Sequence, residues 1–558
     1  RPSARQQRQS AASCKGVVMN GMTSDPRDHE AFVREIDLGA YESAVSSLPR
    51  GVIPRRKGMT WRQHLGAEIE AIGGRKPAPY TPHSTTCYLF RHPATLSTHR
   101  YLNEYQFYVP LKSDPADGTR WYYGMFLGTR NVAAMVPSMS DICLAKLAKC
   151  VPHTSMTKVG TWTTSPANQA AGAFSASGAA YSATAGETAS GVVSGRTVGL
   201  QFFATTNGGY GIVSIDGDFT RANRLPVFTE ADYVAGRCRP SDVGKRYFSS
   251  YATAAINEFI CLADDLPAGN HTILIEATGL KPSASSAARC YVERIYGVST
   301  GYAVGDSEVY FVPVRWVNHL QTVSALCYVP QWAPVGSTNY QFMGANHSDN
   351  STQSLESQTS LTLYVGDTDQ ASLAAGTFAS GNNIVVRHVT TLAHADSLVT
   401  NVATKTRTYT MVAGRPHPLM LDVDITYSAA GKMQVEYAGM LVVGNYASLD
   451  VVSVRQNEFT KIVVVGNEVG IPMANDGSVA NYRGGPASLW ATGPKVEAWV
   501  ELIDAIPDRR MHASNTGLIQ DSTTANQDKA YLQTVDRITY FPENTQRKFT
   551  IGYGANPA

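Results

Sequence analysis

Residues 195–217 read GRTVGLQFFATTNGGYGIVSIDG, and this stretch decides the fold. Its two runs, Thr197–Thr205 and Tyr210–Ile215, are rich in β-branched and aromatic residues, which favour strands. Asn207-Gly208-Gly209 separates the runs, and Asn and Gly accept the positive φ angles of tight turns. Asp216-Gly217 ends the second run in the same way. The stretch therefore predicts two antiparallel strands joined by a tight turn.

The same pattern of strand-forming runs separated by turn residues continues further along the chain. Residues 266–279 read LPAGNHTILIEATG, a Pro- and Gly-containing turn followed by a run from His271 to Ala277 that alternates between two faces. The segment Cys290–Tyr296 adds a closing strand. Residues 151–300 are therefore predicted to form a β-sandwich.

The remainder, residues 301–558, is also rich in strand patterns. Between Leu421 and Tyr427 apolar residues alternate with Asp422, Asp424 and Thr426, as expected of a half-buried antiparallel strand. Residues 429–431 then turn the chain into KMQVEYAGMLVV, residues 432–443. We expect one or two further β-sandwiches in this part.

Composition supports a large β protein of several domains. The chain has 558 residues, which is several times the size of a typical domain. Hydrophobic residues make up 43% and charged residues only 16%, while Gly (47) and Tyr (28) are abundant. Such a mixture suits many short strands joined by tight turns. The predicted fold class is mainly β, with antiparallel sandwich domains behind an irregular α+β N-terminal region.

Residues 1–150 form that irregular region, which we expect to attach the protein to something else. A short helix is predicted within Asp28–Leu48, a second from Thr60 to Gly74, and a third over Ser140–Cys150. Between them, Tyr101–Phe126 alternates like two paired strands around a turn at residues 114–118.

The charge balance argues against a general affinity for nucleic acid. The chain has 47 basic and 45 acidic residues, a net charge of +2. Basic residues gather locally in two clusters, Arg1, Arg5, Arg8 and Lys15, and then Arg50, Arg55, Arg56, Lys57 and Arg62. We interpret them as a solvated or interface-tethered arm, and a nucleic-acid contact is the less favoured alternative.

Several classes of protein find no support in the sequence. No run of 18 apolar residues exists, so no membrane span is predicted. The chain starts with Arg and shows no apolar signal core, as expected of a processed product or part of a longer chain. Eight scattered cysteines form no CxxC pair, which favours free thiols made in a reducing cytoplasm. The histidines have no metal-ligand spacing, so neither a metal nor a cofactor is predicted.

Two patterns could carry catalysis, and each has a simpler interpretation. Gly305-Asp306-Ser307 matches the start of an esterase motif, but it precedes a strand instead of following one, so we expect a turn. Paired carboxylates hydrolyse glycosides when they are about 5–10 Å apart. The pairs on offer, which also suit solvated surfaces, are Asp264 with Asp265, Asp422 with Asp424, and Glu497 with Glu501. No catalytic residue is predicted.

Aromatic residues provide candidate sugar contacts. A flat ring covers the apolar face of a pyranose while polar neighbours bind its hydroxyls. Trp316, Trp332 and Tyr340 lie in a stretch interrupted by Pro330 and Pro334. They are the candidate glycan-binding residues, and the alternative is that they fill sandwich cores or subunit interfaces.

The order of the quoted motifs, from GRTVGLQFFATTNGGYGIVSIDG through LPAGNHTILIEATG to YVERI (residues 291–295), resembles the galactose-binding-like jelly rolls. These domains occur in carbohydrate-binding modules and in tail spikes and fibres of tailed bacteriophages. The resemblance covers about 150 residues. The run 432–443 also resembles the outer sandwiches of phage fibres and of sialidase-like proteins.

This resemblance implies a non-enzymatic structural protein of a tailed-phage virion, made in the host cytoplasm. Its expected partners are copies of itself, in a homotrimer, other virion proteins reached through the N-terminal region, and a host-surface glycan. The alternatives are a capsid decoration or head-fibre protein, a polysaccharide depolymerase or esterase, and a secreted bacterial carbohydrate-binding protein.

Overall fold

The chain divides into two compact units, Arg1–Ala78 and Pro79–Ala558. A computed structural model describes parts of the second unit, and the descriptions below concern these parts alone. They are residues 86–92, 101–130, 138–165, 178–253, 256–318, 329–343, 356–397, 400–444, 451–456, 459–464, 471–472, 487–492, 496–503, 518–520, 527–535 and 538–557.

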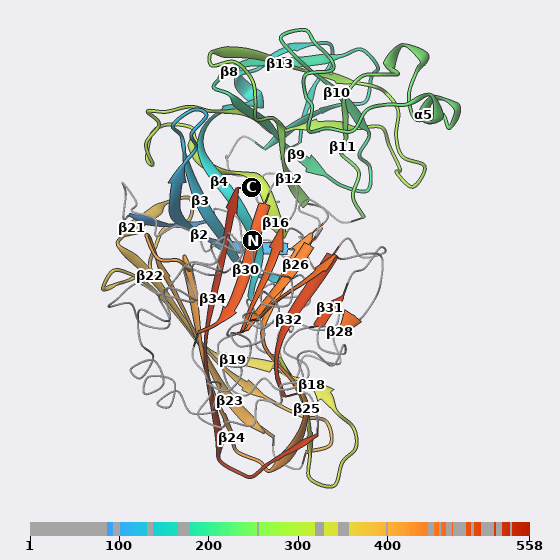
Figure 1. Cartoon of the computed structure of the whole chain (residues 1–558). Helices are drawn as coiled ribbons and strands as arrows, with labels where there is room; N and C mark the ends of the chain where they lie inside the picture. The colour runs from blue at the N-terminus through green and yellow to red at the C-terminus, as the bar shows by residue number, and fades with distance from the viewer. Residues whose placement is uncertain are drawn as a thin grey trace, which may run out of the picture. The chain divides into compact units, whose positions relative to one another are not determined.

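The protein is mainly β, as the sequence predicts (Figure 1). Its strands form five sheets, and every strand pairing within them is antiparallel. In the described ranges the helical elements are the short α5 (Glu230–Val234) and the single 3-10 turns η1 (His153–Ser155) and η3 (Pro240–Asp242). No helix in these ranges has the length and apolar character needed to cross a membrane.

A nine-stranded sheet runs through all three of the predicted domain ranges. Its order is β12-β9-β15-β4-β3-β2-β1-β21, and β16 also pairs with β4. The boundaries predicted at 150/151 and 300/301 therefore do not separate sheets. The strands are β1 (Cys87–Arg91), β2 (Tyr101–Ser113), β3 (Arg120–Arg130), β4 (Ser138–Pro152), β9 (Thr197–Ala204), β12 (Ile256–Ala263), β15 (Arg294–Val298), β16 (Val309–Asn318) and β21 (Phe378–Gly381).

The predicted hairpin at residues 114–118 is confirmed by β2 and β3, but the helix predicted over Ser140–Cys150 is wrong. This segment is part of β4, which is buried on both faces. Ile142 and Leu144 enter one hydrophobic core, whereas Cys143 and Ala145 enter another on the opposite side. Burial on both faces removes the period-two alternation, so the apolar residues gave a spurious helical spacing. The helices predicted within Asp28–Leu48 and Thr60–Gly74 lie outside the described residues.

The predicted sandwich is formed by a five-stranded sheet that packs on β9, β12 and β15. Leu200, Val213, Ile275 and Ile295 share its hydrophobic core, and the alternation predicted for His271–Ala277 is confirmed. The strand order is β11 (Tyr247–Ser249), β10 (Tyr210–Ile215), β13 (Asn270–Ala277), β8 (Thr188–Ser194) and β5 (Thr157–Val159). A small sheet of β14 (Cys290–Val292), β7 (Ala179–Ser182) and β6 (Thr163–Ser165) lies beside it.

The C-terminal part forms two larger sheets. One has ten strands in the order β20 (Thr368–Asp369), β19 (Glu356–Val365), β22 (Asn383–Leu392), β23 (Ala403–Val412), β24 (Leu419–Tyr427), β34 (Thr545–Pro557), β30 (Val496–Leu502), β29 (Ala487–Thr492), β26 (Val451–Gln456) and β27 (Phe459–Val464). The other has seven strands, β18 (Gln341–Phe342), β17 (Val329–Pro334), β25 (Gly431–Gly444), β32 (Gln527–Val535), β31 (Leu518–Gln520) and β28 (Ile471–Pro472), with β33 (Thr539–Phe541) on β25.

One hydrophobic core joins these two sheets to the nine-stranded sheet. It contains Phe107 and Leu144 from the nine-stranded sheet, Leu421 and Ile551 from the ten-stranded sheet, and Met440 from the seven-stranded sheet. The one-sided pattern predicted for β24 is confirmed, because Leu421, Val423 and Ile425 are buried while Asp422 is exposed. The sandwich therefore has a core of its own, beside a second core that three sheets share.

Candidate functional site

Two of the three candidate glycan-binding residues are core residues. Trp316 is buried, its ring meets Phe126 edge-on at 5.9 Å, and its indole N–H donates to the Phe259 carbonyl at 3.3 Å. Trp332 is fully buried, and a Cβ added at Gly431 would lie 2.1 Å from its ring. A sugar needs an exposed ring face, so this prediction is corrected for both tryptophans.

Tyr340 lies in a described loop after β17 and is half-buried. Its neighbour Asn339 accepts a hydrogen bond at its carbonyl from His394 Nε2 at 3.0 Å. A glycan role for Tyr340 remains a prediction, without the support of the two tryptophans.

Gly305-Asp306-Ser307 forms the predicted turn. Gly305 has a φ of 99° and Glu308 a φ of 59°. The Asp306 carboxylate accepts the Ala303 N–H at 2.9 Å, which anchors the turn before β16. Asp306 and Ser307 are therefore explained by local backbone geometry.

The carboxylates of Asp422 and Asp424 belong to a cross-strand ladder between β24 and β34. Asp422 accepts a hydrogen bond from Thr550 at 2.6 Å. Asp424 accepts one from Gln546 at 2.8 Å and forms an ion pair with Lys548 at 2.9 Å. Such cross-strand pairs stabilise a solvated sheet face.

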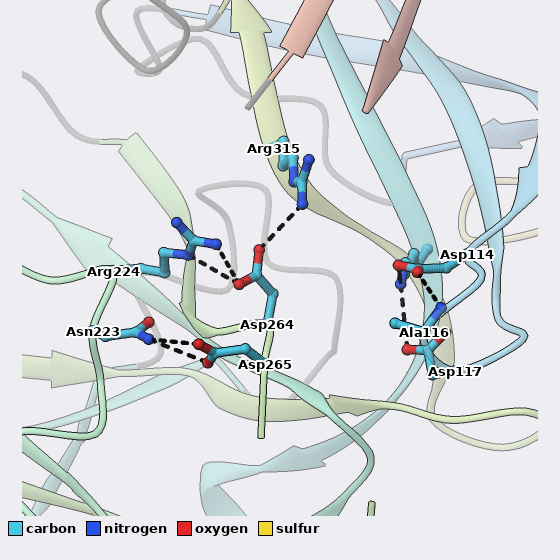
Figure 2. A network of polar contacts seen from close by, with 9 residues as sticks. Asp114, Ala116, Asp117, Asn223, Arg224, Asp264, Asp265 and Arg315 are labelled. Carbon is cyan, nitrogen blue, oxygen red and sulfur yellow. Dashed lines mark hydrogen bonds and ion pairs between the residues drawn. The ribbon is translucent and has the colours of Figure 1, made fainter. Parts of the chain in front are cut away.

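A further carboxylate pair, Asp264 and Asp265, belongs to a larger polar network (Figure 2). Asp264 follows β12, and it lies between two guanidinium groups. Arg224 binds one carboxylate oxygen through Nε (3.1 Å) and a second nitrogen, and Arg315 on β16 lies 3.4 Å from the other oxygen. Asp265 accepts from the Asn223 amide at 3.1 Å and 3.2 Å, one distance to each oxygen.

Lys146 on β4 forms the other half of this network. Its ammonium lies 2.7 Å from Asp114 and 3.4 Å from Asp117, both in the β2–β3 turn. The same ammonium lies 4.2 Å from the ring centroid of Trp121, and Arg315 lies 5.1 Å from that centroid. Trp121 thus has cation–π contacts with two charged side chains. We call these residues the polar junction: Asp114, Asp117, Trp121, Lys146, Arg224, Asp264 and Arg315.

The charges of the polar junction favour a structural role over acid–base chemistry. Burial raises the pKa of Asp114, but the hydrogen bonds from Lys146 and from the Ala116 N–H outweigh it, so the pKa lies below its ordinary value. A general acid needs the opposite shift. Because Asp264 follows β12 and Arg315 lies on β16, the junction adds a side-chain link between the end of β12 and β16, within a sheet that already joins the sandwich to β4.

At the end of the sandwich the buried His271 pairs with the exposed Asp216, and the sequence patterns did not indicate this pair. His271 Nδ1 lies 2.8 Å from Asp216 Oδ2, and His271 Nε2 lies 2.9 Å from the Pro267 carbonyl oxygen. A carbonyl only accepts, so Nε2 carries a proton and donates. The bond to His271 lowers the pKa of Asp216, which keeps Asp216 an acceptor. Neither ring nitrogen is left to act as a base.

In a second histidine, His417, both ring nitrogens also have polar partners. The indole N–H of Trp499 donates to His417 Nδ1 at 3.1 Å, so the proton of that imidazole lies on Nε2. His417 Nε2 lies 3.0 Å from Glu501. The lone pair that a general base would use is taken by Trp499.

No protein-family model and no curated protein matches this chain. Its function is therefore argued from its own residues.

The described cysteines do not provide a nucleophile. All six described cysteines are buried: Cys87, Cys143, Cys150, Cys238, Cys261 and Cys290. Burial raises the pKa of Cys87 and of Cys150 to about 11, which disfavours the reactive thiolate. Within the described ranges no three His, Cys, Asp or Glu side chains are grouped so as to hold a metal ion.

Proposed function

We propose that this chain is a non-enzymatic structural protein of a tailed-phage virion, an appendage such as a tail fibre or spike. It assembles with copies of itself and recognises a glycan on the host surface. The observation that carries this proposal is that the protein has two separate hydrophobic cores. A sandwich with its own core shares the nine-stranded sheet with a β body whose core three sheets share, and the polar junction adds an ion pair between them. Such an arrangement presents a rigid binding module on a structural support.

The titratable groups described above are engaged in hydrogen bonds and ion pairs, which supports a structural role. His271 and His417 use both ring nitrogens in hydrogen bonds, and Asp264 is ion-paired. An enzyme needs a base with a free lone pair or an acid with a raised pKa at its reaction centre. These groups instead hold loops and strands in place.

Exposed apolar side chains support contact between copies. Val335, Ile538 and Tyr540 are 57%, 58% and 55% exposed, and they lie where β17, β25 and β33 pair. Pro334 and Phe541 both pair with Gly431 of β25, which places these side chains on one end of the seven-stranded sheet. Apolar groups gathered in this way often mark an interface.

The proposal is tested by light scattering and a glycan array on the same purified protein. A stable trimer that binds a bacterial surface glycan, and leaves the glycan intact, is the expected result. A monomer that binds no glycan contradicts the appendage proposal. Release of shortened glycan products contradicts the non-enzymatic part of it.

A second candidate is a capsid protein, and the basic residues at positions 1, 5, 8 and 15 favour it. Clustered basic residues bind the nucleic acid that a shell encloses. This candidate predicts that the purified chain carries nucleic acid, with a raised ratio of absorbance at 260 nm to that at 280 nm. The appendage proposal predicts a ratio typical of protein alone.

A further inference from the structure

An aromatic cluster lies on the face of the five-stranded sheet that points away from the sandwich core. Tyr247 on the edge strand β11 stacks on Phe228, with ring centroids 3.8 Å apart and an interplanar angle of 5°. Tyr210 on β10 meets both rings edge-on, each at 5.6 Å. Ile212, next to Tyr210 on the same face, is buried with them. The cluster therefore rests on a fixed base of paired strands.

Tyr247 is half-buried, in contrast to the fully buried Phe228 beneath it. One face of the Tyr247 ring is closed by Phe228, and Tyr210 covers part of its edge. Of the two faces of the Tyr247 ring, the one turned away from Phe228 is therefore the face on which a ligand can lie. This gives a flat apolar platform whose orientation is set by packing, as a sugar ring requires.

Polar groups border this platform. Arg237 directly precedes Cys238, which packs in the same hydrophobic cluster as Tyr210 and Phe228. Burial, with the Asp232 charge, raises the pKa of Tyr247, and the Arg237 charge opposes that shift. The same two residues act on Tyr210. Arg237 binds Asp232 at 2.5 Å, but its side chain is 51% exposed, which leaves guanidinium N–H groups to donate to a ligand.

The position of Asp232 is fixed by the start of α5. Its carboxylate accepts the Thr229 backbone N–H at 2.8 Å and the Thr229 hydroxyl at 2.7 Å, while the Asp232 N–H donates back to Thr229. This is a capping box, and it places Asp232 on the first turn of the helix. The partner of Arg237 is thus held before any ligand arrives.

Ion pairs also hold the rest of the loop between β10 and β11. Arg221 binds Asp216 at 2.7 Å, and the buried Asp242 binds Arg239 at 2.6 Å and Lys245 at 3.2 Å. A preorganised loop loses little conformational entropy when a ligand binds. Long loops on a rigid sheet are common places for recognition.

We propose that Tyr247 and Arg237, with the Tyr247 ring positioned by Phe228 and Tyr210, form a glycan-binding site that takes one pyranose unit. The apolar face of the sugar lies on the Tyr247 ring, and the Tyr247 hydroxyl and the Arg237 guanidinium bind its hydroxyl groups. This inference rests on the proposed function, for which it replaces the buried tryptophans as the place of sugar contact.

The test uses saturation-transfer NMR on the purified full chain with methyl glycosides of glucose, galactose, N-acetylglucosamine and rhamnose. At least one glycoside is expected to receive saturation, most strongly at the ring protons of a single face. Tyr247→Ala should abolish the signal, because it removes the platform. Arg237→Ala should weaken binding about tenfold, which is the usual loss for a charged hydrogen bond.

Two further variants separate binding from folding. Tyr247→Phe keeps the stacked ring and should retain saturation of the sugar face. Tyr364→Ala removes another half-buried strand tyrosine, on β19, and should leave the signal unchanged. The site is overturned if no glycoside is saturated, or if Tyr247→Ala and Tyr364→Ala behave alike.

The outcomes for the site and for the proposed function are distinguishable. If a trimer binds a glycan on the array equally well with Tyr247→Ala, the site is wrong and the appendage proposal stands. If the glycosides bind at Tyr247 but the protein is a monomer that retains none of the array glycans, the site stands and the appendage proposal fails.

Discussion

The guanidinium of Arg547 on β34 binds the carboxylate of Glu436 on β25, and both side chains are buried. The Arg547 Nε lies 3.3 Å from one carboxylate oxygen, and a second nitrogen binds the other oxygen. The pair joins the ten-stranded sheet to the seven-stranded sheet. Arg547 also lies 5.4 Å from the ring centroid of Phe541 and 5.3 Å from that of Phe549.

Removing one member of this pair should destabilise the protein strongly. Glu436→Gln leaves the Arg547 charge buried opposite a neutral amide, and such losses cost about 3–5 kcal/mol. The free energy of unfolding in urea measures this. The double variant Glu436→Gln/Arg547→Met removes both charges and should recover part of the loss. An unchanged unfolding free energy for Glu436→Gln would show that the pair does not hold the two sheets together.

The polar junction yields a prediction with a neighbouring control. Asp264→Asn removes the negative charge that lies between Arg224 and Arg315, so the unfolding free energy should fall by about 1–3 kcal/mol. Asp265→Asn changes the adjacent but exposed carboxylate, which meets only an amide among its described contacts, and should cost less than about 0.5 kcal/mol. Equal losses in the two variants would argue against the junction as a link between the end of β12 and β16.

His388 on β22 should make stability depend on pH. Burial, followed by the nearby Arg407 charge, lowers its pKa from 6.5 to about 3, although Glu356 opposes the shift. Its Nδ1 lies 2.8 Å from an Arg407 nitrogen, so it accepts that hydrogen bond in the neutral form. The folded state therefore excludes a proton that the unfolded chain binds below pH 6.5.

The sign of the effect follows from this difference. The unfolding free energy falls as pH decreases from 6.5 toward 3, by at most about 1.4 kcal/mol per pH unit for one proton. Urea unfolding of the wild type and of His388→Gln at pH 7, 6 and 5 checks it. The variant lacks the titrating group, so its stability should change less over this range. Parallel pH profiles would contradict the prediction.

The exposed apolar end of the seven-stranded sheet should control self-association. Ile538→Asp and Tyr540→Asp each place a charge where a second copy would pack, so light scattering should show a shift from trimer to monomer. Val192→Asp, at a residue that is 54% exposed on β8, serves as the control and should leave the mass unchanged. A trimer in all three variants would place the interface elsewhere.

How much of the fold could be predicted depended on whether a strand is buried on one face or on two. β24 has an exposed face, so the alternation of Leu421 and Asp422 is visible in the sequence. β4 is buried on both faces, and its apolar residues therefore resembled a helix. One-sided strands could thus be predicted, whereas a strand inside the structure could not.

The candidate sites were harder to predict, because they depend on contacts between distant residues. Trp332 was chosen because prolines flank it, but it fills the core instead. The stack of Tyr247 on Phe228 exists only because the loop between β10 and β11 folds back on the sheet. Asp264 was noticed as half of a carboxylate pair, while its true partners include Arg315, which lies on a later strand.

The pairing of β1 with β21 has a consequence for how the protein is made. Cys87 pairs with Gly381, so one edge of β1 stays open until that distant strand has been synthesised. At about 5–20 residues per second, the ribosome needs roughly 15–60 s to travel from residue 87 to residue 381. During that interval the nascent chain carries an unprotected strand edge that other chains can bind. Yield in a cell should therefore depend on chaperone supply and on growth temperature more than the stability of the finished fold would suggest.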